Sequence, residues 1–233
     1  LVELRERRNA RPVPRGGRLG LYHFAILLPE RPALGRFLRH LSDRSVRVGA
    51  ADHLVSEALY LTDPDGLGIE VYADRPRDTW QHQGGQLLMA SDPLDAADVV
   101  AAAGPAAWVR MPAGTSMGHL HLHVGDLAAG ERFYHAGLGL DRMVWDYPGA
   151  LFLAAGGYHH HLGINTWAKG APPASAEDAR LLEWTLRLPG PAQVAEAAAS
   201  LEAAGNPVTR DGTAALARDP WGTTLRLVPG GTA

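Results

Sequence analysis

Histidine is the residue type whose spacing in this sequence could support chemistry. His119, His121 and His123 alternate along the segment GHLHLHV, so on a strand their side chains would share one face. His159 and His161 would share a face of the segment YHHHLGINTW in the same way. Imidazole is both an acid–base group and a common metal ligand. The pattern indicates a histidine-lined surface that binds a metal, contacts a substrate or packs.

Composition and motifs exclude several other chemistries. The chain contains no cysteine, which rules out disulfides, thiolate nucleophiles and cysteine-based zinc or iron–sulfur sites. No serine stands in a G-x-S-x-G setting, and the glycine-rich segment 16–20 follows no strand, which argues against a phosphate-binding loop. A net charge of -3 provides no basic patch for nucleic acid, and no run of about 18 apolar residues could span a membrane. We therefore expect a cytoplasmic protein with neither kind of partner.

The elements that must position these side chains form an internal repeat. Residues 22–29 read as a strand, residues 33–41 as a helix with leucines at helical spacing, and residues 53–61 as a second strand. The turn DPDG and a further strand at 68–72 complete this copy. The same order recurs at the C-terminus, with a strand at 183–189, followed by a helix at 191–205, a strand at 213–220, the turn DPWG and a strand at 223–229. Agreement in element order and turn chemistry predicts repeated modules.

A third copy lies between these two. Its strands are expected at 118–124, 150–157 and 158–167, with a helix over 127–138. Residues 1–6 alternate apolar and charged side chains, and we expect them to be the last strand of a further module whose remainder is absent from the sequence. The chain then divides into an N-terminal module pair (1–90), a linker (91–116) and a C-terminal module pair (117–233).

Several segments carry a family resemblance. YHFAILLP, DHLVSEALYLTDPDGLGIEVY with DRPRDTW, GHLHLHV and YHHHLGINTW resemble the bacterial catechol 2,3-dioxygenase-like branch of the vicinal-oxygen-chelate superfamily, which also contains glyoxalases and bleomycin-resistance proteins. The resemblance covers nearly the whole chain. It implies an α+β fold in which repeated βαβββ modules pair into cup-shaped mixed sheets.

In this superfamily the metal ligands lie on the first and last strands of the modules. The resemblance therefore implies that His23 and Glu70 are metal ligands, with a third ligand on the first strand of the missing module and Glu3 as a further candidate. Two histidines and a carboxylate suit Fe(II) and leave positions for a substrate, with Mn(II) or Zn(II) as alternatives. The competing interpretation makes His23 a core histidine bonded to a backbone carbonyl and Glu70 a salt-bridged strand end.

The last two modules offer a weaker second set of ligands. His121, His161 and Glu183 could form another pair of histidines with a carboxylate, since Glu183 occupies in its module the position of His23. Arg226, however, stands where Glu70 stands, and a fixed cation repels a metal. The alternative is that Arg226 pairs with Glu183 and that no metal binds there.

Two further residues are candidates for catalysis. His53 precedes the DPDG hairpin and could donate a hydrogen bond to the site or act as an acid or base, unless it is an exposed histidine at a strand start. Tyr72 faces the same side as Glu70 and could line the pocket.

The function that the resemblance implies is a metal-dependent dioxygenase that cleaves a small catecholic substrate in the extradiol manner. The sequence does not fix the oligomeric state, and a homodimer is one arrangement open to the chain. A glyoxalase-type isomerase or lyase acting on a dicarbonyl compound uses the same fold. Another alternative is a binding protein without catalytic activity, like the resistance proteins of the same fold, because the fold alone does not determine the function.

Overall fold

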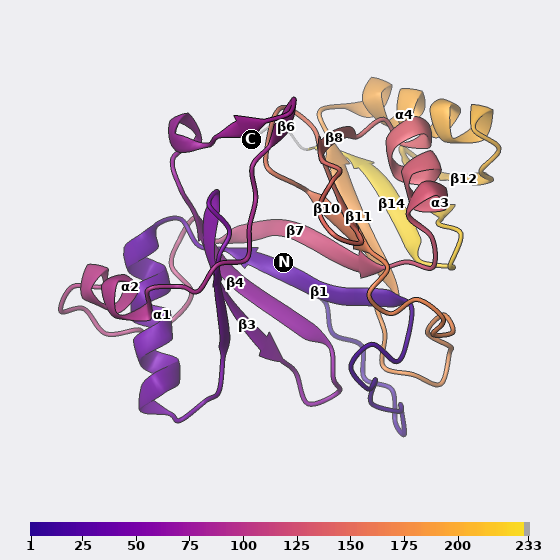
Figure 1. Ribbon diagram of the computed structural model, residues 1–233. Coiled ribbons are helices and arrows are strands. Elements are labelled where there is room, and N and C mark those ends of the chain that lie inside the picture. The colour runs from indigo at the N-terminus through magenta and orange to yellow at the C-terminus, as the bar shows by residue number, and fades with distance from the viewer. Residues whose placement is uncertain (231–233) are drawn as a thin grey trace. The chain divides into compact units, whose positions relative to one another are not determined.

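The computed structural model describes residues 1–230, which form two compact units (Figure 1). The N-terminal unit comprises residues 1–9 and 23–121. The C-terminal unit comprises residues 10–22 and, of the described residues, 122–230. No helix in residues 1–230 is long and apolar enough to cross a membrane.

The N-terminal unit contains one complete βαβββ module. Its elements are β1 (Gly20–Leu27), α1 (Arg31–Asp43), β2 (Gly49–Asp52), β3 (Ser56–Thr62) and β4 (Gly68–Asp74). The strand order is β2-β3-β4-β1, with β1 parallel to β4 and the other neighbours antiparallel. The sheet is therefore mixed, and the two strands that begin and end the module lie side by side.

The helix α1 forms where the leucine spacing predicts it. Leu34, Leu38 and Leu41 are buried on one face of the helix, and Leu34 and Leu38 pack in one core cluster with Leu59 and Val71 of the sheet. Proline in its first turn is compatible with a helix start, because the first amide groups have no partner within the helix.

The rest of the N-terminal unit follows β4. A 3-10 turn, η1 (Arg77–Thr79), leads into the short hairpin β5 (His82–Gln83) and β6 (Gln86–Leu87), and then into α2 (Ala96–Ala102) and β7 (Ser116–His123). Figure 1 shows α2 beside α1, and its buried Val99 belongs to the core cluster of α1. In the sheet, β7 is the neighbour of β1.

The C-terminal unit holds two more sets of strands. The first consists of α3 (Leu127–Glu131), the π-helical turn η2 (Arg132–Gly137), β8 (Asp141–Val144), β9 (Ala150–Ala154) and β10 (Leu162–Asn165), with strand order β10-β9-β8. The second consists of β11 (Glu183–Leu188), α4 (Pro191–Ala203), β12 (Val208–Asp211), β13 (Ala214–Arg218) and β14 (Thr224–Pro229). Its order, β11-β14-β13-β12, repeats that of the first module, and β11 is again parallel to β14. The predicted α+β fold of βαβββ modules with mixed sheets is confirmed.

Two local expectations are wrong. Residues 1–6 form no strand and are exposed, and they pair with no strand of residues 1–230. Residues 158–161 lie in a turn before β10, because Gly156 and Gly157 turn the chain with positive φ and Nδ1 of His161 accepts a hydrogen bond from the amide of Ala155. His159 and His161 therefore do not share a strand face.

The division into module pairs remains a prediction. The two compact units have other boundaries than 1–90, 91–116 and 117–233. Within the expected linker, α2 contributes Val99 to the core of the N-terminal unit.

Candidate metal centre

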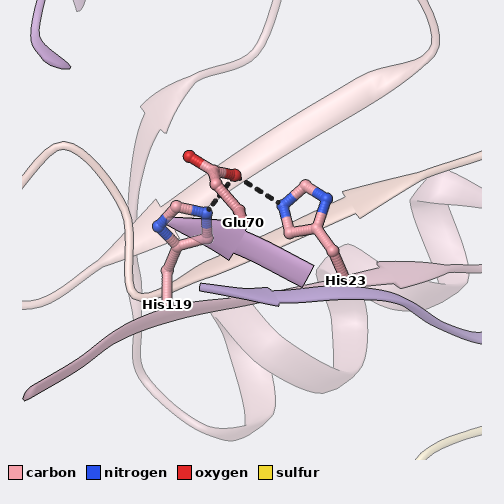
Figure 2. Close-up of side chains that lie close together, drawn as sticks. All are labelled: His23, Glu70 and His119. Carbon is pink, nitrogen blue, oxygen red and sulfur yellow. Dashed lines mark hydrogen bonds and ion pairs between the residues drawn. The ribbon is translucent and has the colours of Figure 1, made fainter. Parts of the chain in front are cut away.

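Three side chains of the N-terminal unit converge on one point. Figure 2 shows the imidazoles of His23 on β1 and His119 on β7 directed at the carboxylate of Glu70 on β4. Oε2 of Glu70 lies 3.0 Å from Nε2 of His23 and 3.1 Å from Nε2 of His119. All three side chains are buried. This is the only group of three potential ligands whose donor atoms lie within 4.8 Å of one another in residues 1–230.

Strand register explains the convergence. The strand order β4-β1-β7 puts β1 between the other two. Glu70 is opposite Ala25, two residues from His23 on β1, so His23 and Ala25 share a face. Ala25 is fully buried and small, which leaves room above it for the carboxylate of Glu70.

The carboxylate of Glu70 is held in its charged form. Burial by itself raises the pKa of Glu70, but the charge of His119 and the hydrogen bonds from His119 and His23 outweigh it, so the pKa lies well below its usual range. A buried carboxylate requires a cationic partner in contact with it. The space between the two imidazoles and the carboxylate is therefore suited to a positive charge.

The donor set fits a divalent metal ion. Two imidazole nitrogens and one carboxylate oxygen are ligands typical of Fe(II), Mn(II) and Zn(II). Three protein ligands also leave coordination positions for a substrate. His23, Glu70 and His119 could thus hold such an ion.

His119 occupies the position that we expected a residue outside the sequence to fill. The alternation of His119, His121 and His123 shows that the three side chains share one face, but it does not show which of them points at Glu70. The pairing of β7 with β1 determines that His119 does so, and this pairing joins segments almost a hundred residues apart. The ring of His121 stands edge-on to His23, with 5.0 Å between the ring centroids.

Tyr72 packs directly behind His119. Its side chain is fully buried, and its ring centroid lies 4.9 Å from that of His119. Gly118 makes this contact possible, because a Cβ atom there would lie 1.8 Å from the Tyr72 hydroxyl. Tyr72 therefore supports the position of His119.

His53 reaches the site through Tyr60. Nε2 of His53 lies 2.5 Å from the hydroxyl of Tyr60, and Nδ1 lies 2.6 Å from the carbonyl oxygen of Ala90. Tyr60 is directly opposite Glu70 in the β3–β4 pair, and its ring centroid is 5.6 Å from that of His23. Our sequence interpretation missed Tyr60. It lies opposite Glu70 because the two residues are equidistant from Asp65, the centre of the five-residue loop 63–67 that contains the DPDG turn.

The second set of expected ligands is engaged in other contacts. Nε of Arg226 donates to Oε1 of Glu183 over 2.6 Å, and Arg226 also contacts Asp211. Glu183 is opposite Thr224, as His23 is opposite Gly68, so the ion pair occupies the places of His23 and Glu70. The ion pair between Glu183 and Arg226 that the alternative predicted is present, and the absence of a metal from that module stays a prediction. Nδ1 of His161 accepts the hydrogen bond from the amide of Ala155 that is described above.

Comparison with known proteins identifies the family. No family model matches the chain. The chain is 42% identical over 224 residues to the catechol-2,3-dioxygenase of Bacillus subtilis (strain 168), which covers 94% of this chain and 78% of that protein. The chain belongs to the catechol 2,3-dioxygenase-like branch of the vicinal-oxygen-chelate superfamily.

Solved structures of this superfamily share the fold. A putative dioxygenase from Bacillus subtilis subsp. subtilis str. 168 aligns with a TM-score of 0.60 and 12% identity over 92% of this chain. The chain spans 63% of the length of that protein. Glyoxalase I from Zea mays aligns with a TM-score of 0.54 and 18% identity, over 91% of this chain and 70% of that protein.

Proposed function

We propose that this protein is a metal-dependent dioxygenase that opens the ring of a small catecholic substrate in the extradiol manner. The observation that carries the proposal is the buried convergence of His23, Glu70 and His119. Fe(II) is the ion that we assign to this set, with Mn(II) and Zn(II) as alternatives. The similarity to a protein named catechol-2,3-dioxygenase supports a catecholic substrate.

The side chains of the site have separate tasks in this proposal. His23, Glu70 and His119 hold the ion, which when bound supplies Lewis acidity to the two oxygens of a diol. Burial of all three ligands limits the access of water, which strengthens electrostatic interactions in the site. Tyr60 stands beside His23 with His53 behind it, so the phenol oxygen of Tyr60 is the group that would bond a substrate hydroxyl.

Metal analysis and a catechol assay test the proposal together. Protein purified without chelator is analysed for metal, loaded anaerobically with Fe(II) and given oxygen with a panel of catechols. We expect a yellow ring-opened product, and we expect His23→Ala to lose both the metal and the product. The matched control is His82→Ala, since His82 is an exposed histidine of the same unit. Normal metal content in His23→Ala would remove His23 from the site.

A glyoxalase-type isomerase or lyase is the second candidate. It is supported by the same donor set and by the fold shared with glyoxalase I of Zea mays. The discriminating assay supplies a 2-oxoaldehyde with a thiol to the metal-loaded protein in the absence of oxygen. Turnover there, without cleavage of any catechol, would favour this candidate. Protein that holds no metal and binds an apolar ligand would instead indicate sequestration.

A further inference from the structure

The imidazole ring of His23 needs support from its surroundings to serve as a metal ligand. Rotation about the bond between Cβ and the ring moves Nε2, the atom 3.0 Å from Oε2 of Glu70, toward or away from that carboxylate. For histidine this torsion is broad and roughly two-fold, so the side chain does not fix it by itself. The groups packed against the ring must therefore set the direction of Nε2.

Three aromatic rings lie around the ring of His23. The ring centroid of His121 is 5.0 Å away, that of His119 is 5.5 Å away and that of Tyr60 is 5.6 Å away. His121 is thus the nearest of the three, and the planes of the two imidazoles are inclined at 85°. Aromatic rings favour this edge-on packing, and a rotation of the His23 ring would break it.

His121 is itself held in place on β7. Its side chain is buried and shares a strand face with that of His119, two residues earlier. Leu120 lies between them, points to the opposite face and is buried too. Close packing on both faces limits the movement of the strand at this point. One strand therefore carries the ligand His119 and also the ring that packs against the other imidazole ligand, His23.

We propose that His121 is a positioning residue, which packs edge-on to the ring of His23 and so keeps Nε2 directed at Glu70. The role depends on the flat ring at position 121 and requires no proton transfer there. The inference rests on the proposed function in taking His23, Glu70 and His119 as metal ligands. It deepens that function by assigning the residue that sets the geometry of one ligand.

The first test measures the contact in metal-free protein. Proton–proton NOEs between the rings of His23 and His121 are recorded in histidine-labelled protein, with His23→Ala and His121→Phe used to assign the resonances. We expect direct NOEs, because ring centroids 5.0 Å apart bring the ring protons within range of the effect. Absence of these NOEs would overturn the inference.

The second test uses Co(II), whose visible absorption reports the geometry of its ligands. In His121→Ala the ring of His23 loses its nearest aromatic neighbour. We expect Co(II) affinity to fall by about 10-fold, the lower end of the effect of losing a residue that orients a metal ligand. The Co(II) absorption should change as well, since the direction of Nε2 changes. Wild-type affinity and absorption in His121→Ala would overturn the proposal.

Two further variants separate positioning from general damage. His121→Phe keeps a flat ring without ring nitrogens, so it should restore the wild-type Co(II) absorption, with an affinity within about threefold of wild type. Leu120→Ala makes a cavity on the opposite face of the same strand, so it should lower stability in denaturant unfolding and leave the Co(II) absorption unchanged. Behaviour of His121→Phe like that of His121→Ala would contradict a packing role, and so would an equal spectral change in Leu120→Ala.

The outcomes for the two proposals are distinguishable. An altered Co(II) site in His121→Ala, in a protein that cleaves no catechol with Fe(II), would sustain the positioning role and refute the dioxygenase. Ring cleavage by a protein whose His121→Ala variant binds Co(II) normally would do the reverse. Wild-type protein that binds no Co(II) would overturn the positioning role together with the metal centre on which it rests.

Discussion

Nε2 of His119 donates a hydrogen bond to Oε2 of Glu70, the same carboxylate oxygen that faces His23. One oxygen atom of Glu70 on β4 therefore lies close to side chains from both β1 and β7. Because the carboxylate is buried and charged, removal of that charge changes the surroundings of both imidazoles at once.

Glu70→Gln should abolish tight metal binding with little change of shape. The amide keeps the size of the side chain but loses the negative charge that attracts a cation. Loss of a residue that hydrogen-bonds to a metal ligand lowers the affinity for the metal by about 10- to 100-fold. Loss of a ligand itself should lower that affinity by at least about 100-fold. Metal titration of the purified variant measures this. Glu196→Gln, on the exposed surface of α4, is the control, and equal metal affinity of the two variants would exclude Glu70 as a ligand.

Gly118→Ala should damage the site through Tyr72. The added Cβ would lie 1.8 Å from the Tyr72 hydroxyl, so the fully buried ring must move, and that ring supports His119. Overpacking of this kind costs about 1–3 kcal/mol of unfolding free energy. Denaturant unfolding and metal titration should show loss of stability together with weaker metal binding. Gly190→Ala, where a Cβ approaches only the flexible Gln193 side chain, should leave metal binding unchanged.

Local patterns in the sequence predicted the regular elements well. The helix expected at 33–41 is the centre of α1, and that at 191–205 coincides with α4 to within two residues, because leucine spacing, proline and glycine mark their faces and ends. The strands β2, β8 and β12 were missed. Each has only four residues and lies at the end of its sheet order, so neither burial nor alternation marks it strongly.

The candidate site was predictable only in part, for a physical reason. His23 and Glu70 lie on strands of one module, whose repeat could be read from turns and spacing. His119 joins them through the pairing of β7 with β1, which no local pattern encodes. Tyr60 was missed because the loop between β3 and β4 is the five residues 63–67, whereas a count symmetric about the four-residue DPDG turn puts residue 69 opposite residue 60.

The Glu183–Arg226 ion pair should contribute little to stability. Both side chains are about a third exposed, at 34% and 29%, so solvent screens their attraction. We expect Arg226→Ala to lower the free energy of unfolding by less than about 1 kcal/mol. Arg226→Glu should cost more, since it brings two carboxylates together beside Asp211. Metal content should be unaffected by either variant, and its loss in Arg226→Ala would indicate that the last module takes part in metal binding.

Asp178 should make the C-terminal unit sensitive to acid. Hydrogen bonds from Arg18 first, and then from the amide of Ser175, hold the pKa of Asp178 far below its ordinary value of 3.8. A carboxyl whose pKa is lower in the folded state stabilises the protein above its unfolded-state pKa, and that contribution is lost as the pH falls toward the folded-state value. Wild-type stability attributable to Asp178 is therefore complete at pH 7 and declines below about pH 4.

Asp178→Asn tests this acid dependence. The amide cannot carry the charge that Arg18 and Arg11 contact, so the variant should be less stable than wild type at pH 7. The difference between the two proteins should shrink as the pH is lowered from 4 to 2, because the carboxyl then binds a proton in the unfolded chain and its contribution to wild-type stability falls. Urea unfolding of both proteins at several pH values measures the difference directly and cancels the titration of all other groups. A difference that stays constant across this range would show that the charge of Asp178 contributes nothing to folding and that its role is confined to hydrogen-bonding geometry.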